Sequence, residues 1–174
     1  LPVTVPEHRL QHHPQRDRQP GNRPETGSFE GGEGIKAPLH AVAEIERSGH
    51  QASAIQCDQR DLGAIDRLFD RLRQEVGRLD ILINSAAIME RQAVLDITPG
   101  DWARVIDTNL RGPFFMAQRA AQWMLTAGGG VIVNIADLSA LHPWPSYLTH
   151  TISKSGIVAM TQTLALALAP SIRV

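Results

Sequence analysis

The stretch LDILIN, residues 79–84, is an apolar run that leads into the small residues SAA at 85–87. A short continuous apolar run is typical of a strand that is buried on both faces of a parallel sheet. Small residues after such a strand let the backbone approach a flat ligand closely, although a tight turn alone would need them too. We expect a buried strand here, with Asn84 and Ala86 at its ligand-facing end.

Predicted strands and helices alternate along the chain on both sides of this stretch. The period of the apolar residues predicts helices at 39–49, 64–77, 98–130 and 150–169, and strands at 52–58, 131–135 and from 172 onwards. This alternation predicts an α/β fold with a doubly wound parallel sheet. In such sheets, ligand sites lie at the carboxyl ends of the strands.

The first 38 residues differ from the rest of the chain. They hold six of its eleven prolines and three of its seven histidines, and they show no helical or strand period. We predict an irregular or disordered arm at 1–38 and a partial domain at 39–174. Because no carboxylate or cysteine at ligand spacing accompanies the histidines, no metal site is expected. A first residue other than methionine and an apolar last segment suggest a fragment.

Composition excludes several classes of function. The net charge of −1 gives no reason to expect nucleic acid as a partner. No apolar run reaches the roughly 18 residues that a membrane span needs, so no membrane partner is expected. The single cysteine, Cys57, excludes an internal disulfide and agrees with a reducing, cytoplasmic location.

The long helix predicted at 98–130 contains a proline that should disturb it. Pro113 lies four residues after Asn109 and has no amide hydrogen, so the Asn109 carbonyl loses its partner within the helix. We expect a kink at this point and a carbonyl that is free to bind a water molecule.

From residue 39 onwards, the chain resembles the short-chain dehydrogenase/reductase family. Four segments carry the resemblance in the family's order and spacing, namely LDILINSAA, DTNLRGPFF, GGGVIVNIADLSA and HTISKSG. The resemblance implies a Rossmann-like fold, NAD or NADP as cofactor, and a small-molecule substrate whose carbonyl and alcohol forms are interconverted. It also implies a homo-oligomer that is formed through the helices at 101–127 and 150–169.

The resemblance also assigns roles to four residues of a catalytic site. Lys154 matches the lysine that holds the nicotinamide ribose, and Asn109 matches the asparagine that supports a relay water. His150 stands at the position of the family's tyrosine, and Asp137 stands at the position of its serine. Tyr147 lies three residues before the tyrosine position and is out of register.

The two substitutions leave two interpretations open. An imidazole titrates near pH ~6.5 and can act as a base without help from a lysine, so His150 and Asp137 could exchange a proton with a carbonyl/alcohol pair. Alternatively, the site has lost its acid, and the chain is an inactive α/β module that acts through subunit association.

The cofactor-binding half is predicted to be incomplete. By resemblance, Asp58 binds adenine, although it could equally cap the next helix; Asn84, Ala86 and Lys154 would complete the cofactor contacts. The segment at 26–34 contains the letters of a glycine-rich turn, but no apolar strand precedes it and Pro38 interrupts any helix after it. We therefore expect the first βαβ unit and the C-terminal strand of the fold to be missing or scrambled.

Overall fold

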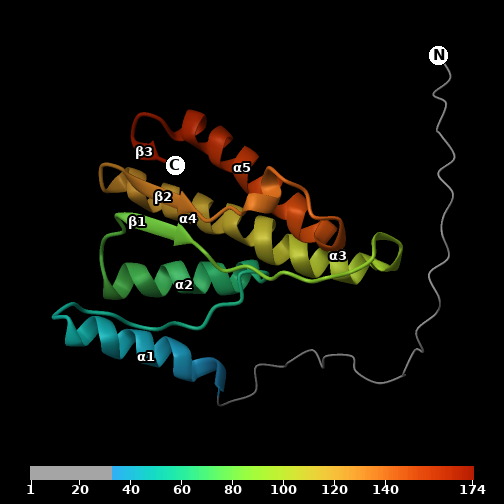
Figure 1. Ribbon diagram of the computed structural model, residues 1–174. Helices are drawn as coiled ribbons and strands as arrows, with labels where there is room; N and C mark the ends of the chain where they lie inside the picture. Colours follow the sequence, from blue (N-terminus) through green and yellow to red (C-terminus); the bar gives the residue numbers. More distant parts are fainter. Residues whose placement is uncertain (1–32) are drawn as a thin grey trace, which may run out of the picture. The chain divides into compact units, whose positions relative to one another are not determined.

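The computed structural model describes residues 33–174, with side chains from residue 40 onwards. The irregular arm predicted at 1–38, its histidines and the glycine-containing segment at 26–34 therefore lie almost entirely outside the described residues. The chain divides into two compact units at Ala54 and Ile55. Figure 1 shows the helices and strands of both units.

The first unit contains helix α1, Glu33–Arg47, which ends before Gly49 at a φ of +86°. The helix predicted at 39–49 is thus present, but it begins six residues earlier, and the predicted boundary at 38 falls inside it. Pro38 does not prevent this early start. A proline near a helix start costs only one hydrogen bond, to the carbonyl four residues before it.

The second unit contains a parallel sheet, as predicted, and its strand order is β1–β2–β3. Its strands are β1 (Ile81–Asn84), β2 (Gly130–Asn134) and β3 (Ile172–Arg173). In the register of β1 and β2, Ile81 pairs with Val131 and Asn84 with Asn134. The strand predicted at 52–58 is wrong, because this segment is extended but pairs with no strand of the described chain. A strand is stable only when a neighbour accepts and donates its backbone hydrogen bonds.

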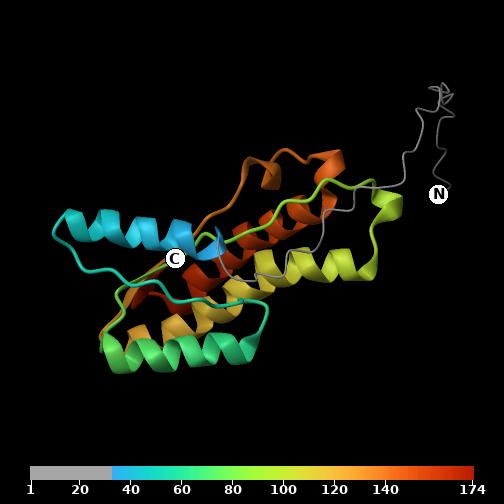
Figure 2. The ribbon, with the colours of Figure 1, turned by 90° about the horizontal axis from the view of Figure 1, so that it is seen from below.

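The helices of this unit are α2 (Leu62–Glu75), α3 (Pro99–Ile106), α4 (Gly112–Thr126) and α5 (Leu148–Leu168). Figure 2 shows α2, α4 and α5 running side by side. Asp61 caps α2 by accepting a hydrogen bond from the amide of Gly63, so the capping role left open for Asp58 belongs to Asp61. None of the helices in the described part of the chain is long and apolar enough to cross a membrane.

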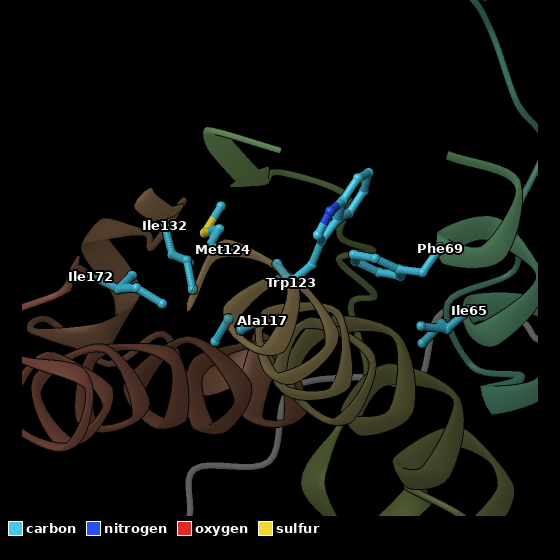
Figure 3. Close-up of a cluster of buried hydrophobic side chains, with 9 residues drawn as sticks. Ile65, Phe69, Ala117, Trp123, Met124, Ile132 and Ile172 are labelled. Carbon is cyan, nitrogen blue, oxygen red and sulfur yellow. The ribbon is translucent and has the colours of Figure 1, made fainter. Parts of the chain in front are cut away.

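The hydrophobic core lies between the sheet, α4 and α2 (Figure 3). Phe69 comes from α2, Trp123 and Met124 from α4, and Ile132 and Ile172 from the strands, and all are at least 93% buried. Ile65 and Phe69, four residues apart, form the side of α2 that packs on the core. Helices α2 and α4, which form this core with the sheet, thereby also hold the ends of the strands in place.

The expectation that β1 is buried on both faces is wrong. Ile81 and Ile83 are 58% and 59% exposed, whereas Leu82 and Asn84 point towards the helix layer. Val133 and Ile135, in and just after β2, are also exposed. The helices of this unit cover only one face of the sheet. The strands nevertheless have apolar residues on both faces, as is typical of a sheet that is covered on both sides.

The helix predicted at 98–130 is interrupted where proline predicted a kink. Residues Asp107–Arg111 form a π-turn between α3 and α4, and the amide of Gly112 donates to the carbonyl of Asp107, five residues back. Gly112 is required here, because a Cβ atom on it would lie 2.6 Å from the carbonyl oxygen of Gln59. A π-turn re-aims the side chains that it carries, and Asn109 lies in its middle.

Candidate active site

Helix α5 carries His150 and Lys154 one turn apart on its buried side. Their exposed fractions are only 4% and 6%, although both are polar side chains that ordinarily lie in water. Residues four apart in a helix lie on the same face. The pattern HTISK therefore brings an imidazole and an ammonium to one place in the interior.

The two ring nitrogens of His150 have different surroundings. Nδ1 lies 3.1 Å from the carbonyl oxygen of Ile88 and 3.4 Å from Nδ2 of Asn109. Nε2 is buried, has no hydrogen-bond partner in the described chain, and lies 3.9 Å from Oδ1 of Asp137. A buried polar atom without a partner is rare in folded proteins, and a catalytic role is one explanation for it.

Asn109 holds the peptide group of Ile88 through both ends of its side chain. Its Oδ1 accepts from the amide of Ile88 at 2.8 Å, and its Nδ2 donates to the carbonyl of Ile88 at 2.8 Å. Nδ2 also donates to Oγ of Ser153 at 3.1 Å, and Ser153 in turn donates to the carbonyl of His150. The buried amide thus joins the π-turn, the segment after β1 and helix α5.

Asp137 follows β2 and faces the histidine. Its Oδ1 accepts from the backbone amide of Ser139 at 2.7 Å. Hydrogen bonding by Ser139 holds the pKa of the Asp137 carboxyl below its usual value, and the charges of His150 and Lys154 act in the same direction. Asp137 is therefore ionised at neutral pH.

Lys154 donates from Nζ to the carbonyl oxygen of Ile135 at 2.7 Å. Burial lowers the pKa of its ammonium, and the negative charge of Asp137 partly opposes that shift. The structure thus brings all four of the predicted catalytic residues together, and the Asp137 carboxylate interacts through its charge with both His150 and Lys154.

The predicted cofactor-binding residues are distributed differently. The Asp58 carboxylate is engaged by the guanidinium of Arg60 at 2.7 Å, and hydrogen bonding from Arg60 lowers the pKa of Asp58. Asn84 points into the helix layer, where Nδ2 donates to the carbonyl of Pro113 and to Oδ1 of Asn134. Ala86 is exposed.

Sequence patterns missed three contributors to the site. Ile88 contributes its main-chain carbonyl, which leaves no mark in the letters of a sequence. Ser153 and Ser139 support their neighbours by hydrogen bonds, and a serine directly before Lys154 was the only signal available. No group of histidine, cysteine and acidic residues that could hold a metal occurs within residues 40–174, the part searched.

The nicotinamide-ribose end of a dinucleotide fits the residues that are present. A buried lysine, an unpartnered Nε2 and the small exposed residues at 85–87 provide a cation, a ring nitrogen that can exchange a proton and a stretch of backbone without bulky side chains. For the pyrophosphate end, the described chain offers no glycine-rich turn between a strand and a helix. The fit therefore covers one half of the cofactor.

Comparison with known proteins gives consistent matches. The family model described as enoyl-(acyl carrier protein) reductase matches residues 34–174. The chain is 32% identical over 132 residues to 2-dehydro-3-deoxy-D-gluconate 5-dehydrogenase of Escherichia coli K12, which covers 75% of the chain and 52% of that protein. It is 36% identical over 129 residues to galactitol 2-dehydrogenase of Agrobacterium fabrum, covering 74% of the chain and 50% of that protein.

Solved structures agree with these matches. A crystal structure from Sinorhizobium meliloti 1021, assigned as a short-chain alcohol dehydrogenase, superposes with a TM-score of 0.76 and 35% identity. The superposition covers 78% of the chain and 54% of that protein. The chain therefore spans about half the length of the relatives that it matches.

Proposed function

Because the chain belongs to the short-chain dehydrogenase/reductase family, we propose that its site interconverts an alcohol and a carbonyl with NAD or NADP. The observation that carries the proposal is the buried, unpartnered Nε2 of His150 beside an ionised aspartate and a buried lysine. The proposal concerns the activity of the whole protein. This chain would supply the part of the active site that transfers the proton.

In this proposal, His150 replaces the family's tyrosine as proton donor and acceptor. A bound dinucleotide supplies the acceptor or donor of the hydride. When an alcohol is oxidised, its hydroxyl proton passes to Nε2 as the carbon–hydrogen bond breaks. When a carbonyl is reduced, the protonated Nε2 polarises the oxygen and then gives up its proton.

Asp137 would act on the histidine rather than on the substrate oxygen. An ionised carboxylate accepts hydrogen bonds and donates none, so it cannot take over the part of a serine that donates to a carbonyl. It lies where it can stabilise the positive imidazolium that forms after proton transfer. Lys154 would bind the ribose, and the small residues around Ala86 would leave room for the nicotinamide.

Titration of the purified chain with NADH and NADPH tests the proposal, with fluorescence as readout. Saturable binding is expected, and Lys154→Ala should abolish it. Arg71→Ala removes an exposed cation from α2 and should leave binding unchanged. If neither dinucleotide binds the unmodified chain, the enzymatic proposal is wrong for this chain, and the interpretation as an inactive module remains.

Polyols such as galactitol are suitable first substrates for an activity assay, since one of the relatives is named galactitol 2-dehydrogenase.

A second proposal concerns association with another copy. An apolar groove of about 180 Å³ runs between α4 and α5, and its lining includes Phe114, Ala121, Leu125, Leu164 and Leu168. A groove of this kind on the predicted oligomer helices is consistent with burial against a partner. Sedimentation should show an oligomer that Leu125→Arg, at a half-exposed position of the groove, dissociates and Gln74→Arg on α2 does not. A monomer at every concentration would contradict it.

The location and the choice of cofactor remain parts of the proposal. A cytoplasmic location is proposed from the single, half-buried Cys57, and cell fractionation tests it. The two arms of the dinucleotide titration, with NADH and with NADPH, compare the two cofactors directly.

A further inference from the structure

We propose that the carbonyl of Ile88 fixes His150 in the tautomer with the proton on Nδ1, and that Asn109 acts as a positioning residue by holding this carbonyl. Nε2 is thereby kept as the proton acceptor that faces Asp137. This inference deepens the proposed function and rests on it for its catalytic meaning, but its geometry can be tested without any measurement of activity.

The contact between His150 and Ile88 determines where the proton lies. A carbonyl oxygen has lone pairs and no hydrogen, so a ring nitrogen 3.1 Å away is favourable only if that nitrogen carries a proton. The alternative tautomer would place the lone pair of Nδ1 against the lone pairs of the oxygen. With one proton on a neutral ring, Nε2 must then be the unprotonated nitrogen.

Asn109 does not compete for Nδ1. Its Nδ2 has two hydrogens, and these are already directed to the carbonyl of Ile88 at 2.8 Å and to Oγ of Ser153 at 3.1 Å. The longer contact of 3.4 Å to the imidazole has no hydrogen left to donate. It is therefore a packing contact, and within the described part of the chain the Ile88 carbonyl is the only acceptor at Nδ1.

The orientation of the Asn109 amide is fixed by the peptide that it holds. Its Oδ1 accepts from the amide of Ile88, and its Nδ2 donates to the carbonyl of the same residue. Exchanging the two ends would set donor against donor and acceptor against acceptor. The peptide of Ile88 is thus held at both of its polar atoms by a side chain that is 99% buried.

This arrangement suits both protonation states of the ring. In the neutral state, Nε2 offers a lone pair to a substrate hydroxyl. In the protonated state, Nδ1 still donates to the Ile88 carbonyl, and the positive ring forms an ion pair with Asp137, whose Oδ1 lies 3.9 Å from Nε2. A proton can therefore arrive at and leave Nε2 while the ring keeps its orientation.

The charged groups around the imidazole are Asp137, from the segment after β2, and Lys154, one turn along the same helix. The groups that face Nδ1 from the other elements, namely the Ile88 carbonyl and the Asn109 amide, are neutral. The orientation of the ring at Nδ1 is therefore set by hydrogen bonding to neutral groups, whereas Nε2 is the nitrogen that lies near the charged Asp137.

Nitrogen-15 NMR of the histidine-labelled full chain tests the inference. At about pH 8.5, where a free imidazole is neutral, we expect the His150 signals to show a protonated Nδ1 and an unprotonated Nε2. Comparison with His150→Gln assigns the signals. A protonated Nε2, or an average of both tautomers, overturns the proposal whatever the activity of the chain.

The role of Asn109 is tested in the same spectra. Asn109→Ala should lose the fixed tautomer, while Gln162→Ala, which removes an exposed amide from α5, should keep it. If Asn109→Ala keeps the fixed tautomer, Asn109 has no positioning role. Should Asn109→Ala fail to fold, Ser153→Ala removes one bond from the same amide and should broaden or shift the signals of Nδ1; unchanged signals would contradict the role. If the unmodified chain shows the expected tautomer but has no enzymatic activity, the proposed function is wrong and the inference about the tautomer still holds.

Discussion

Asn84 donates from Nδ2 to Oδ1 of Asn134 at 2.9 Å, so that two residues paired in register across β1 and β2 are also joined through their side chains. Asn134 continues the chain of hydrogen bonds to Oγ1 of Thr161 in α5. The end of the sheet that leads into the candidate site is thereby tied to the helix that carries His150 and Lys154.

Replacement of Asn84 by alanine should destabilise the fold. It removes the donor to Asn134 and to the carbonyl of Pro113 and leaves these groups without a partner in a buried place, at a cost of about 1–3 kcal/mol. Urea denaturation followed by circular dichroism measures the free energy of unfolding. Gln162→Ala, at an exposed amide, is the control. A change in Asn84→Ala no greater than in this control would show that the buried amide chain adds nothing.

The two faces of the sheet should respond differently to the same substitution. Ile132 is 1% exposed and Ile83 is 59% exposed, although the two residues lie in neighbouring strands. Ile132→Ala should cost about 2–5 kcal/mol, because it leaves a cavity in the core. Ile83→Ala should change the free energy of unfolding by about 0.5 kcal/mol or less. Equal losses in urea denaturation would mean that the exposed face is covered in solution.

Removal of the imidazole should separate catalysis from cofactor binding. His150→Gln keeps a polar side chain but cannot take part in proton transfer, so kcat should fall by roughly 10²- to 10⁴-fold. The affinity for dinucleotide should stay within about twofold, since Lys154 is unchanged. Steady-state kinetics and fluorescence titration measure the two quantities. Full activity in His150→Gln would assign the proton transfer to another group.

Burial of Lys154 should make stability depend on alkaline pH. Because desolvation lowers the pKa of its ammonium in the folded state, the unfolded chain binds the proton more tightly. The energetic cost of the buried charge is fully present below the pKa of the folded state and disappears as pH rises towards 10.5, the ordinary pKa of a lysine ammonium. The free energy of unfolding should therefore rise with pH in this window relative to that of Lys154→Met.

Urea denaturation of both proteins at several pH values between neutral and alkaline gives this difference directly. Lys154→Met removes the charge but keeps an unbranched apolar stem of similar length. A difference between the two proteins that stays constant with pH would show that the ammonium is not penalised by burial.

Local patterns predicted the parts of the fold that depend on near neighbours. The period of the apolar residues predicted the helix that contains Ile65 and Phe69, and Pro113 predicted the irregularity around Asn109. Positions 150 and 154 were predicted together from the family resemblance, and their spacing of four residues puts both on one side of a helix. In each case the deciding contacts lie within a few residues.

Contacts with distant segments decided the rest. The segment at 52–58 has the composition of a strand, but strand formation depends on a pairing partner that no local pattern supplies. The exposure of Ile83 depends on what covers the sheet, and the same letters would suit a buried position. The role of Ile88 lies in its backbone, so its side chain gave no indication of it.

The π-turn at Asp107–Arg111 has a consequence for how one continuous helix is used. An ordinary helix advances by about 100° per residue, so one extra residue in a turn changes the rotational phase of everything that follows. Asn109 can thus face Ile88 and Ser153 while Ala117 and Met124 still face the sheet. Deletion of a single residue from the turn would restore a regular helix. It would also rotate either Asn109 away from Ile88 and Ser153, or Ala117 and Met124 away from the sheet.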